Sequence, residues 1–174
     1  SQNKPFVYRC INRLDRDTTG LTIVAKHALA GGILGNAVAK RAIHRTYYAV
    51  CSGCTPAYMR ISAPIARKDA STIERCVDFK RGENAVTDFI RIKYNPDNNL
   101  SLVKLRLLTG RTHQIRVHMK YIGFPLIGDF LYNPDYTYIS RQALHSGRLV
   151  FTHPVTGQKM NLISDIPSDM KSLF

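Results

Sequence analysis

Hydrophobic residues alternate with polar residues over several short segments of the chain, and this alternation predicts β-strands. The clearest segment is LSLVKLRLL at 100–108, where a break in the alternation between Leu102 and Leu105 predicts a bulge. Further strands are predicted at 21–26, 45–53, 71–79, 85–94, 143–154 and 159–164. Turn-forming clusters such as NPDNN at 95–99 separate them, so the middle of the chain is predicted to be an antiparallel meander.

Apolar residues one turn apart predict helices elsewhere. Leu29, Ile33 and Ala37 have this spacing within 27–44, although Gly31, Gly32 and Gly35 lie in the same segment and weaken the helix. A short helix is also expected at 165–174. The segments 21–26 and 27–44 are therefore predicted to be a buried strand followed by a helix.

The segment TGRTHQIRVHMKYIGF at 109–124 has the most regular helical pattern. Ile115, Met119 and Ile122 form an apolar stripe. The residues of the neighbouring polar stripe are His113, Arg116 and Lys120. We expect one face of this helix to pack and the adjacent face to be cationic.

Strands in runs, with two or three helices between them, predict an α+β fold with a largely antiparallel sheet. The chain has 174 residues, of which 44% are hydrophobic, and it contains no internal repeat. A chain of this length and composition is expected to form one globular domain with its own core.

Positive charge is abundant and spread along the whole length. Lys and Arg number 25 against 12 Asp and Glu, which gives a formal net charge of +13. Such an excess favours a polyanionic partner, most often nucleic acid, because neutralised phosphates release their counterions. An anionic membrane surface is the competing partner, but Trp is absent and no basic amphipathic helix carries aromatic residues on its apolar face.

Cysteine and histidine give little support for a metal site. Only Cys51 and Cys54, in CSGC, have a ligand-like spacing, and no second pair follows. His113 and His118 lie five residues apart without an acidic partner. We therefore expect no metal, reduced thiols and a cytoplasmic protein.

The segment INRLDRDTTG at 11–20 places two of the scarce acids, Asp15 and Asp17, beside Arg13 and Arg16. A surface ion pair of little energetic value would account for this mixture. Alternatively, the nearby positive charge could hold Asp15 as an ionised carboxylate, which could serve as a nucleophile or a general base. The local sequence leaves both interpretations open.

Two other polar segments are equally ambiguous. In TGRTHQIR, Arg111, His113 and Arg116 could hold phosphates, Arg116 could pair with Asp15 across a cleft, or the residues could form a solvated face. In RTYYAV, aromatic and basic residues alternate in a way that suits stacking on an RNA base. Only one of the two tyrosines there can face a cleft, and the pattern does not say which.

Taken together, these motifs resemble one family. NRLDRDTTGLTIVAK, RTYYAV and LLTGRTHQIRVHMKYIGFPLIGDFLY, followed by ALHSGRLVFTHPVTG, are similar in sequence and order to the RluA-type pseudouridine synthases, from about Val7 to the end. The resemblance implies a mixed, mainly antiparallel sheet split by a basic catalytic cleft, with flanking helices. It also implies isomerisation of uridine in ribosomal or transfer RNA without a metal or organic cofactor.

The resemblance also implies roles for particular residues. The catalytic aspartate matches Asp15, the active-site tyrosine matches Tyr47, and the active-site arginine matches Arg116. Asp17 is then a structural acid of the same loop. The residues expected to bind RNA or support the cleft are Arg13, Arg16, Arg45, Arg111, His113 and Lys120.

Two departures from the family pattern involve residues that keep their hydrogen-bonding capacity: Asn12 stands where His is common, and Thr19 where Ser is common. Relatives usually carry an upstream strand segment and often an S4 RNA-binding domain. We expect residues 1–174 to be the catalytic domain without them. The sequence does not determine the oligomeric state, and a monomer is slightly favoured over an oligomer. The alternatives are a non-catalytic RNA-binding module with the same fold and a metal-dependent nuclease, for which a cluster of acids is lacking.

Overall fold

A computed structural model describes residues 7, 9–69 and 73–174. The main sheet has the strand order β11-β10-β4-β9-β8-β5, and the short β2 pairs with β10 outside this path. The β2–β10 pairing is parallel, and the other pairings of the described strands are antiparallel. The chain therefore has the α+β fold with a mainly antiparallel sheet that its sequence predicts.

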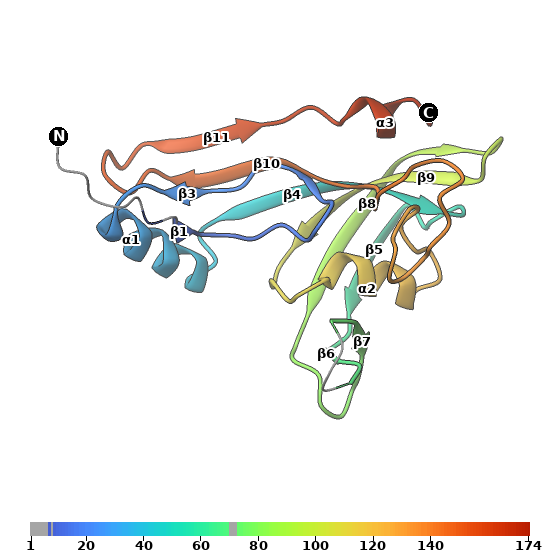
Figure 1. Ribbon diagram of the computed structural model, residues 1–174, viewed down its shortest axis with the longest axis horizontal. Helices are drawn as coiled ribbons and strands as arrows, with labels where there is room; N and C mark the ends of the chain where they lie inside the picture. The colour runs from blue at the N-terminus through green and yellow to red at the C-terminus, as the bar shows by residue number, and fades with distance from the viewer. Residues whose placement is uncertain (1–6, 8, 70–72) are drawn as a thin grey trace.

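The strands of the main sheet run across the whole molecule (Figure 1). Their bounds are β2 Thr19–Gly20, β4 His44–Ser52, β5 Tyr58–Ser62, β8 Val86–Asn95, β9 Leu100–Leu107, β10 Leu144–Thr152 and β11 Lys159–Ile163. The two small sheets consist of β1 Arg9–Cys10 with β3 Val24–Ala25, and β6 Ile65–Arg67 with β7 Arg75–Val77. The β6–β7 hairpin projects away from the main sheet (Figure 1).

Three helices accompany the sheet in the described part of the chain: α1 Ala28–Ala39, α2 Gln114–Tyr121 and α3 Ser168–Lys171. Met119 and Ile115 of α2 join Ala49, Val103 and Leu105 in a core on one face of the sheet. A second core forms beneath α1. A third, which includes Val50 and Met170, covers the opposite face near the C-terminus, since neighbouring residues of a strand point to opposite faces.

Several predicted elements differ in extent. Helix α1 ends at Ala39, because Arg41 has a positive φ of 55° and His44 already begins β4. Only Val24–Ala25 of the strand predicted at 21–26 is paired. The expected bulge lies on the partner strand, where the register shifts between Arg91 and Lys93 of β8. The first two residues of the strand predicted at 71–79 lie outside the described residues.

No helix among the described residues combines the length and apolar character needed to cross a lipid bilayer.

Gly20 is the last residue of β2 and lies against the backbone of β10. Its φ is +105°, and a Cβ atom there would lie 2.3 Å from the carbonyl oxygen of Ser146 in β10. We predict that Gly20→Ala lowers the free energy of unfolding by roughly 2 kcal/mol, because alanine is strained at this φ and collides with the backbone. Urea denaturation measures the effect.

Gly35 provides the matched control within α1, since a Cβ atom there meets nothing within 4 Å. Gly35→Ala is expected to raise stability by about 0.5 to 1 kcal/mol through helix propensity. Equal urea midpoints for the two variants would contradict the proposed restraint at Gly20.

Candidate active site

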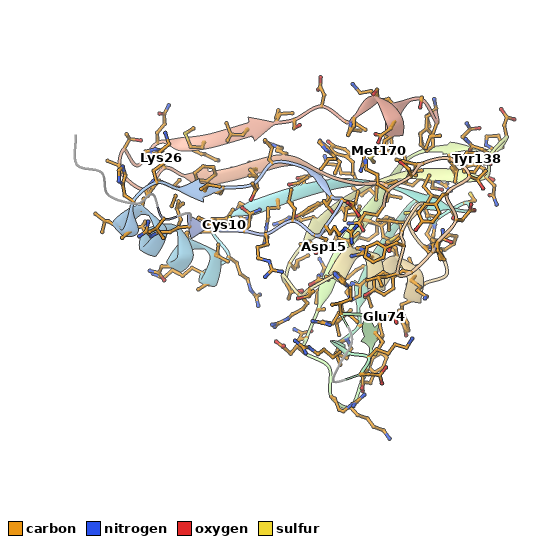
Figure 2. The ribbon with its side chains drawn as sticks, viewed as in Figure 1. Cys10, Asp15, Lys26, Glu74, Tyr138 and Met170 are labelled. Carbon is orange, nitrogen blue, oxygen red and sulfur yellow. The ribbon has the colours of Figure 1, made fainter. Side chains whose placement is uncertain are left out.

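Segments from distant parts of the sequence enclose an open cleft of about 850 Å³. They are the loop before β2, the end of α1 with the start of β4, the end of β9 and the loop that leads into α2. Asp15 lies near the middle of the molecule, where side chains from several elements converge (Figure 2). The cleft therefore brings together the three motifs that carry the family resemblance.

The loop that carries Asp15 is held at one end by the segment before β3 and at the other end by β10. The Asn12 side-chain oxygen accepts a hydrogen bond from the Ile23 backbone N–H at 3.0 Å. The Thr19 hydroxyl lies 2.9 Å from Nδ1 of His145 in β10. Both residues that depart from the family pattern thus make a side-chain hydrogen bond, although the buried Asn12 amide nitrogen has no partner among the described residues.

Arg116 lies at the base of this site, with only 1% of its side chain exposed. Its Nε and Nη2 each donate to a carboxylate oxygen of Asp129 at 2.7 Å, and its Nη1 donates to Asp15 Oδ2 at 3.3 Å. The rings of Phe130 and Tyr132 lie 5.4 Å and 5.0 Å from its Cζ. One guanidinium thus joins two carboxylates from different loops.

The two carboxylates differ in exposure. The Asp129 side chain is fully buried, and its Oδ1 also accepts the backbone N–H groups of Leu131 and Tyr132 at 3.0 Å and 3.2 Å. The Asp15 side chain is 25% exposed and lines the cleft. Asp129 therefore anchors Arg116 from inside, while Asp15 faces the space where a ligand would bind.

Electrostatics keep Arg116 charged. Burial acts to lower the pKa of Arg116, but the hydrogen bonds and charge of Asp129, together with the charge of Asp15, outweigh it and raise this pKa. A permanent cation is thus held in contact with Asp15.

The structure distinguishes the two neighbouring tyrosines. Tyr47 is 5% exposed, packs in the same core as α2 and lines the cleft. Tyr48 lies on the opposite face, against Gly147, and packs with the third core. Burial raises the pKa of Tyr47, Arg45 opposes this effect and Asp15 adds to it, so the phenol is protonated at neutral pH.

The predicted RNA-binding residues divide into two groups. Arg13, Arg45, Arg111 and His113 line the cleft. Arg16 does not line it, and its side chain, 82% exposed, pairs with Asp17 at 3.5 Å. Lys120 is exposed and lies 5.6 Å from the ring of Tyr132.

Of the polar stripe predicted on the helix at 109–124, Arg116 is buried, His113 is half-buried and Lys120 is exposed, so the solvated-face interpretation is wrong for Arg116. On the same helix His118 is buried, and its two ring nitrogens bond the Thr87 hydroxyl and the Ala63 carbonyl, each at 2.9 Å. Gln114 accepts hydrogen bonds from the Thr109 hydroxyl at 2.8 Å and the Arg111 N–H at 2.9 Å. These bonds satisfy the polar groups that α2 buries and fix the loop before it.

Some residues of the site were not identified from the sequence. Asp129 was missed, although a single acid within the apolar segment PLIGDFLY was a usable signal. Arg41, His44 and Arg106 also line the cleft, and the two arginines add positive charge to it. Within the described ranges, no three His, Cys, Asp or Glu residues are grouped to hold a metal ion.

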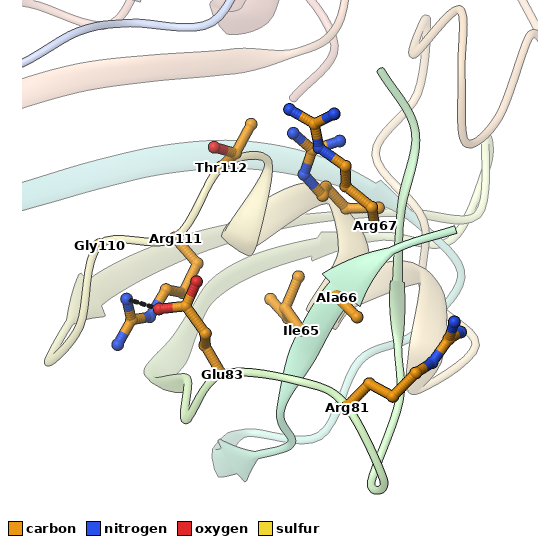
Figure 3. Close-up of a pocket in the computed structure, with 9 residues that line it drawn as sticks. Ile65, Ala66, Arg67, Arg81, Glu83, Gly110, Arg111 and Thr112 are labelled. Atoms are coloured by element: carbon orange, nitrogen blue, oxygen red, sulfur yellow. Dashed lines mark hydrogen bonds and ion pairs between the residues drawn. The ribbon is translucent and has the colours of Figure 1, made fainter. Parts of the chain in front are cut away.

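A second pocket, of about 560 Å³, adjoins the cleft and shares Gly110, Arg111 and Thr112 with it (Figure 3). Its other lining residues come from the β6–β7 hairpin and the chain that follows: Ile65, Ala66, Arg67, Arg75, Arg81 and Glu83. Arg111 pairs with Glu83 at its edge. The basic character of the cleft thus continues toward the hairpin.

Comparison with known proteins agrees with this geometry. The family profile described as RNA pseudouridylate synthase matches residues 1–121. The uncharacterized RNA pseudouridine synthase YjbO of Bacillus subtilis is 47% identical over 166 residues, covering 94% of this chain and 57% of that protein. Ribosomal large subunit pseudouridine synthase D of Zymomonas mobilis is 37% identical over 174 residues, covering 94% of this chain and 54% of that protein.

A solved structure, human RNA pseudouridylate synthase domain containing 1, has a TM-score of 0.79 and 26% identity, and the match covers 91% of this chain and 69% of that one. The chain spans about half the length of the curated relatives it matches. The profile match and the identity to these relatives agree with the motifs of the sequence. The chain therefore belongs to the RNA pseudouridylate synthase family, as its resemblance to the RluA-type enzymes predicted.

Proposed function

We propose that the protein isomerises specific uridines of ribosomal or transfer RNA to pseudouridine, with residues 1–174 as its catalytic domain and the cytoplasm as its location. The observation that carries the proposal is the 3.3 Å contact between Asp15 and the buried Arg116, at a basic cleft that Tyr47 also lines. The names of the relatives support the same reaction. Asp15, Tyr47 and Arg116 are the residues to which we assign catalysis.

The reaction begins with a uridine that leaves its stack in folded RNA and enters the cleft, where its base stacks on Tyr47. Arginine and histidine side chains along the cleft hold the RNA strand, and the arginines neutralise its phosphates. The residues assigned to this role are Arg13, Arg45, Arg111 and His113, with Arg41, His44 and Arg106 added by their position in the cleft. Arg16 and Lys120 are assigned to RNA farther from the target base.

Asp15 then breaks the bond between N1 and C1′. In one route its carboxylate attacks C1′ and uracil leaves as an anion; in the other it removes the 2′ proton, so that the sugar becomes a glycal. Uracil turns within the cleft and C5 attacks C1′, which displaces Asp15 in the first route, whereas in the second the proton returns to C2′. Loss of the C5 proton and protonation of N1 complete the isomerisation.

Arg116 and Tyr47 support these steps in different ways. Arg116 holds the Asp15 carboxylate in place, and its own charge is balanced from behind by Asp129. Tyr47 keeps its proton at neutral pH, because burial raises its pKa. A protonated phenol is a poor base, so we assign removal of the C5 proton to a water molecule that the Tyr47 hydroxyl orients.

Asp15→Asn keeps the shape of the side chain and removes its charge. We predict that pseudouridine formation falls by more than about 10⁴-fold, as expected when a reacting carboxylate is lost. Retention of RNA affinity, measured by filter binding, shows that the variant is folded. Substantial turnover by the variant, measured by mass spectrometry of digested RNA, would refute the role of Asp15.

Intact RNA binding by a wild-type chain that forms no pseudouridine would instead favour a non-catalytic RNA-binding module.

Tyr47→Phe keeps the ring for stacking and removes the hydroxyl. The expected result is a loss of about 10²-fold in the rate of product formation with little change in RNA affinity, because the late proton transfer is impaired. Single-turnover kinetics measure both quantities. An unchanged rate would show that the hydroxyl has no part in the reaction.

Arg41→Gln removes one exposed cation of the cleft. We predict weaker RNA binding, and a slope of log affinity against log salt that is smaller by about 1. Lys171→Gln, in α3 and outside the cleft, is the matched control. Equal salt slopes for the two variants would contradict the placement of RNA along the cleft.

A further inference from the structure

Tyr132 links the β6–β7 hairpin to the cleft through its hydroxyl group. The side chain is buried, at 5% exposure, and its hydroxyl oxygen accepts the backbone N–H of Arg75 in β7 at 2.9 Å. The same oxygen lies 2.9 Å from Nδ1 of His113. Burial raises the pKa of Tyr132 to about 12, so the hydroxyl carries a proton to donate.

The number of available partners determines the direction of this second hydrogen bond. The Arg75 N–H is a fixed donor, so the proton of the Tyr132 hydroxyl needs an acceptor of its own. Among the described residues, His113 Nδ1 is the acceptor within hydrogen-bond distance of the Tyr132 hydroxyl. A buried hydroxyl proton without a partner would cost free energy, and His113 Nδ1 therefore accepts.

His113 itself is firmly held. Its backbone has a left-handed φ of 56° at the residue that precedes α2, a conformation that is costly unless the surroundings enforce it. Its ring meets the Tyr132 ring edge to face, at 5.8 Å between centroids and 79° between planes. With Nδ1 turned to Tyr132, Nε2 has no hydrogen-bond partner among the described residues, and the side chain lines the cleft.

We propose that Tyr132 is a positioning residue that fixes His113 as the neutral tautomer with its proton on Nε2. His113 then donates this hydrogen bond to an oxygen acceptor of the nucleotide in the cleft. The proposal rests on the proposed function and extends it to a residue, Tyr132, that does not itself line the cleft.

The electrostatic surroundings agree with a neutral imidazole. Burial lowers the pKa of His113, Asp15 opposes this effect, and Arg116 and Arg75 add to it. A neutral imidazole has one ring proton. Because Nδ1 accepts a hydrogen bond, this proton is on Nε2.

The test uses variants that separate the hydroxyl from the ring. Tyr132→Phe keeps the ring that packs on Arg116 and removes only the hydroxyl. His113→Leu removes the proposed donor, and the double variant combines the two changes. Tyr121→Phe, at an exposed tyrosine of α2, is the matched control.

Two measurements are made on the whole chain. Nitrogen-15 NMR of the imidazole is expected to show the Nε2–H tautomer in the wild type and in Tyr121→Phe, and a mixture of tautomers in Tyr132→Phe. Single-turnover pseudouridine formation in RNA from cells that lack the gene is expected to fall by about tenfold in Tyr132→Phe and in His113→Leu. The double variant is expected to be no slower than His113→Leu, because Tyr132 acts through His113.

Three results would overturn the inference. They are an Nδ1–H tautomer in the wild type, an unchanged rate in Tyr132→Phe, and a rate loss in the double variant equal to the product of the two single losses, about 100-fold. The last result would mean that the hydroxyl affects the rate independently of His113. A wild-type chain without any pseudouridine formation would refute the proposed function instead, and the nitrogen shifts would still decide the tautomer.

Discussion

The buried positive charge of Arg116 is the constraint on which the site depends. An ion removed from water costs several kcal/mol unless its charge and its hydrogen bonds are matched. Asp129 matches it with two bonds of 2.7 Å, and Asp15 adds a third contact at 3.3 Å. Asp129 in turn accepts hydrogen bonds from the N–H groups of Leu131 and Tyr132. The loop after α2, which carries Asp129, therefore has one favourable position against the helix.

The two acids that bind Arg116 through different nitrogen atoms have different roles. Asp129 is fully buried and therefore serves as a structural counterion. Asp15 remains 25% exposed at the wall of the cleft, where we propose that it acts on a sugar carbon or a 2′ proton. Glycosidases use two carboxylates because one must protonate the leaving group. A single reactive carboxylate is enough when the released base is kept and attached again.

The sequence predicted the main strands, because β9 alternates and because β4, β8 and β10 are runs of β-prone residues bounded by turn-forming clusters. It could not predict the burial of Arg116 and His118, since a helical period locates the apolar stripe but does not tell which polar residues find buried partners. Asp129 was missed for the same reason: its pairing depends on the fold. Alternation alone also could not separate Tyr47 from Tyr48, which the packing of α2 now distinguishes.

The most direct test of the proposed function is a map of pseudouridines in ribosomal and transfer RNA from cells with and without the gene. We expect particular uridines to lose their modification in the deletion strain. We also expect the purified protein to restore the same positions in RNA from that strain, in the presence of a metal chelator and without an added cofactor. Identical maps from the two strains, or restoration that requires a metal ion, would contradict the proposed function.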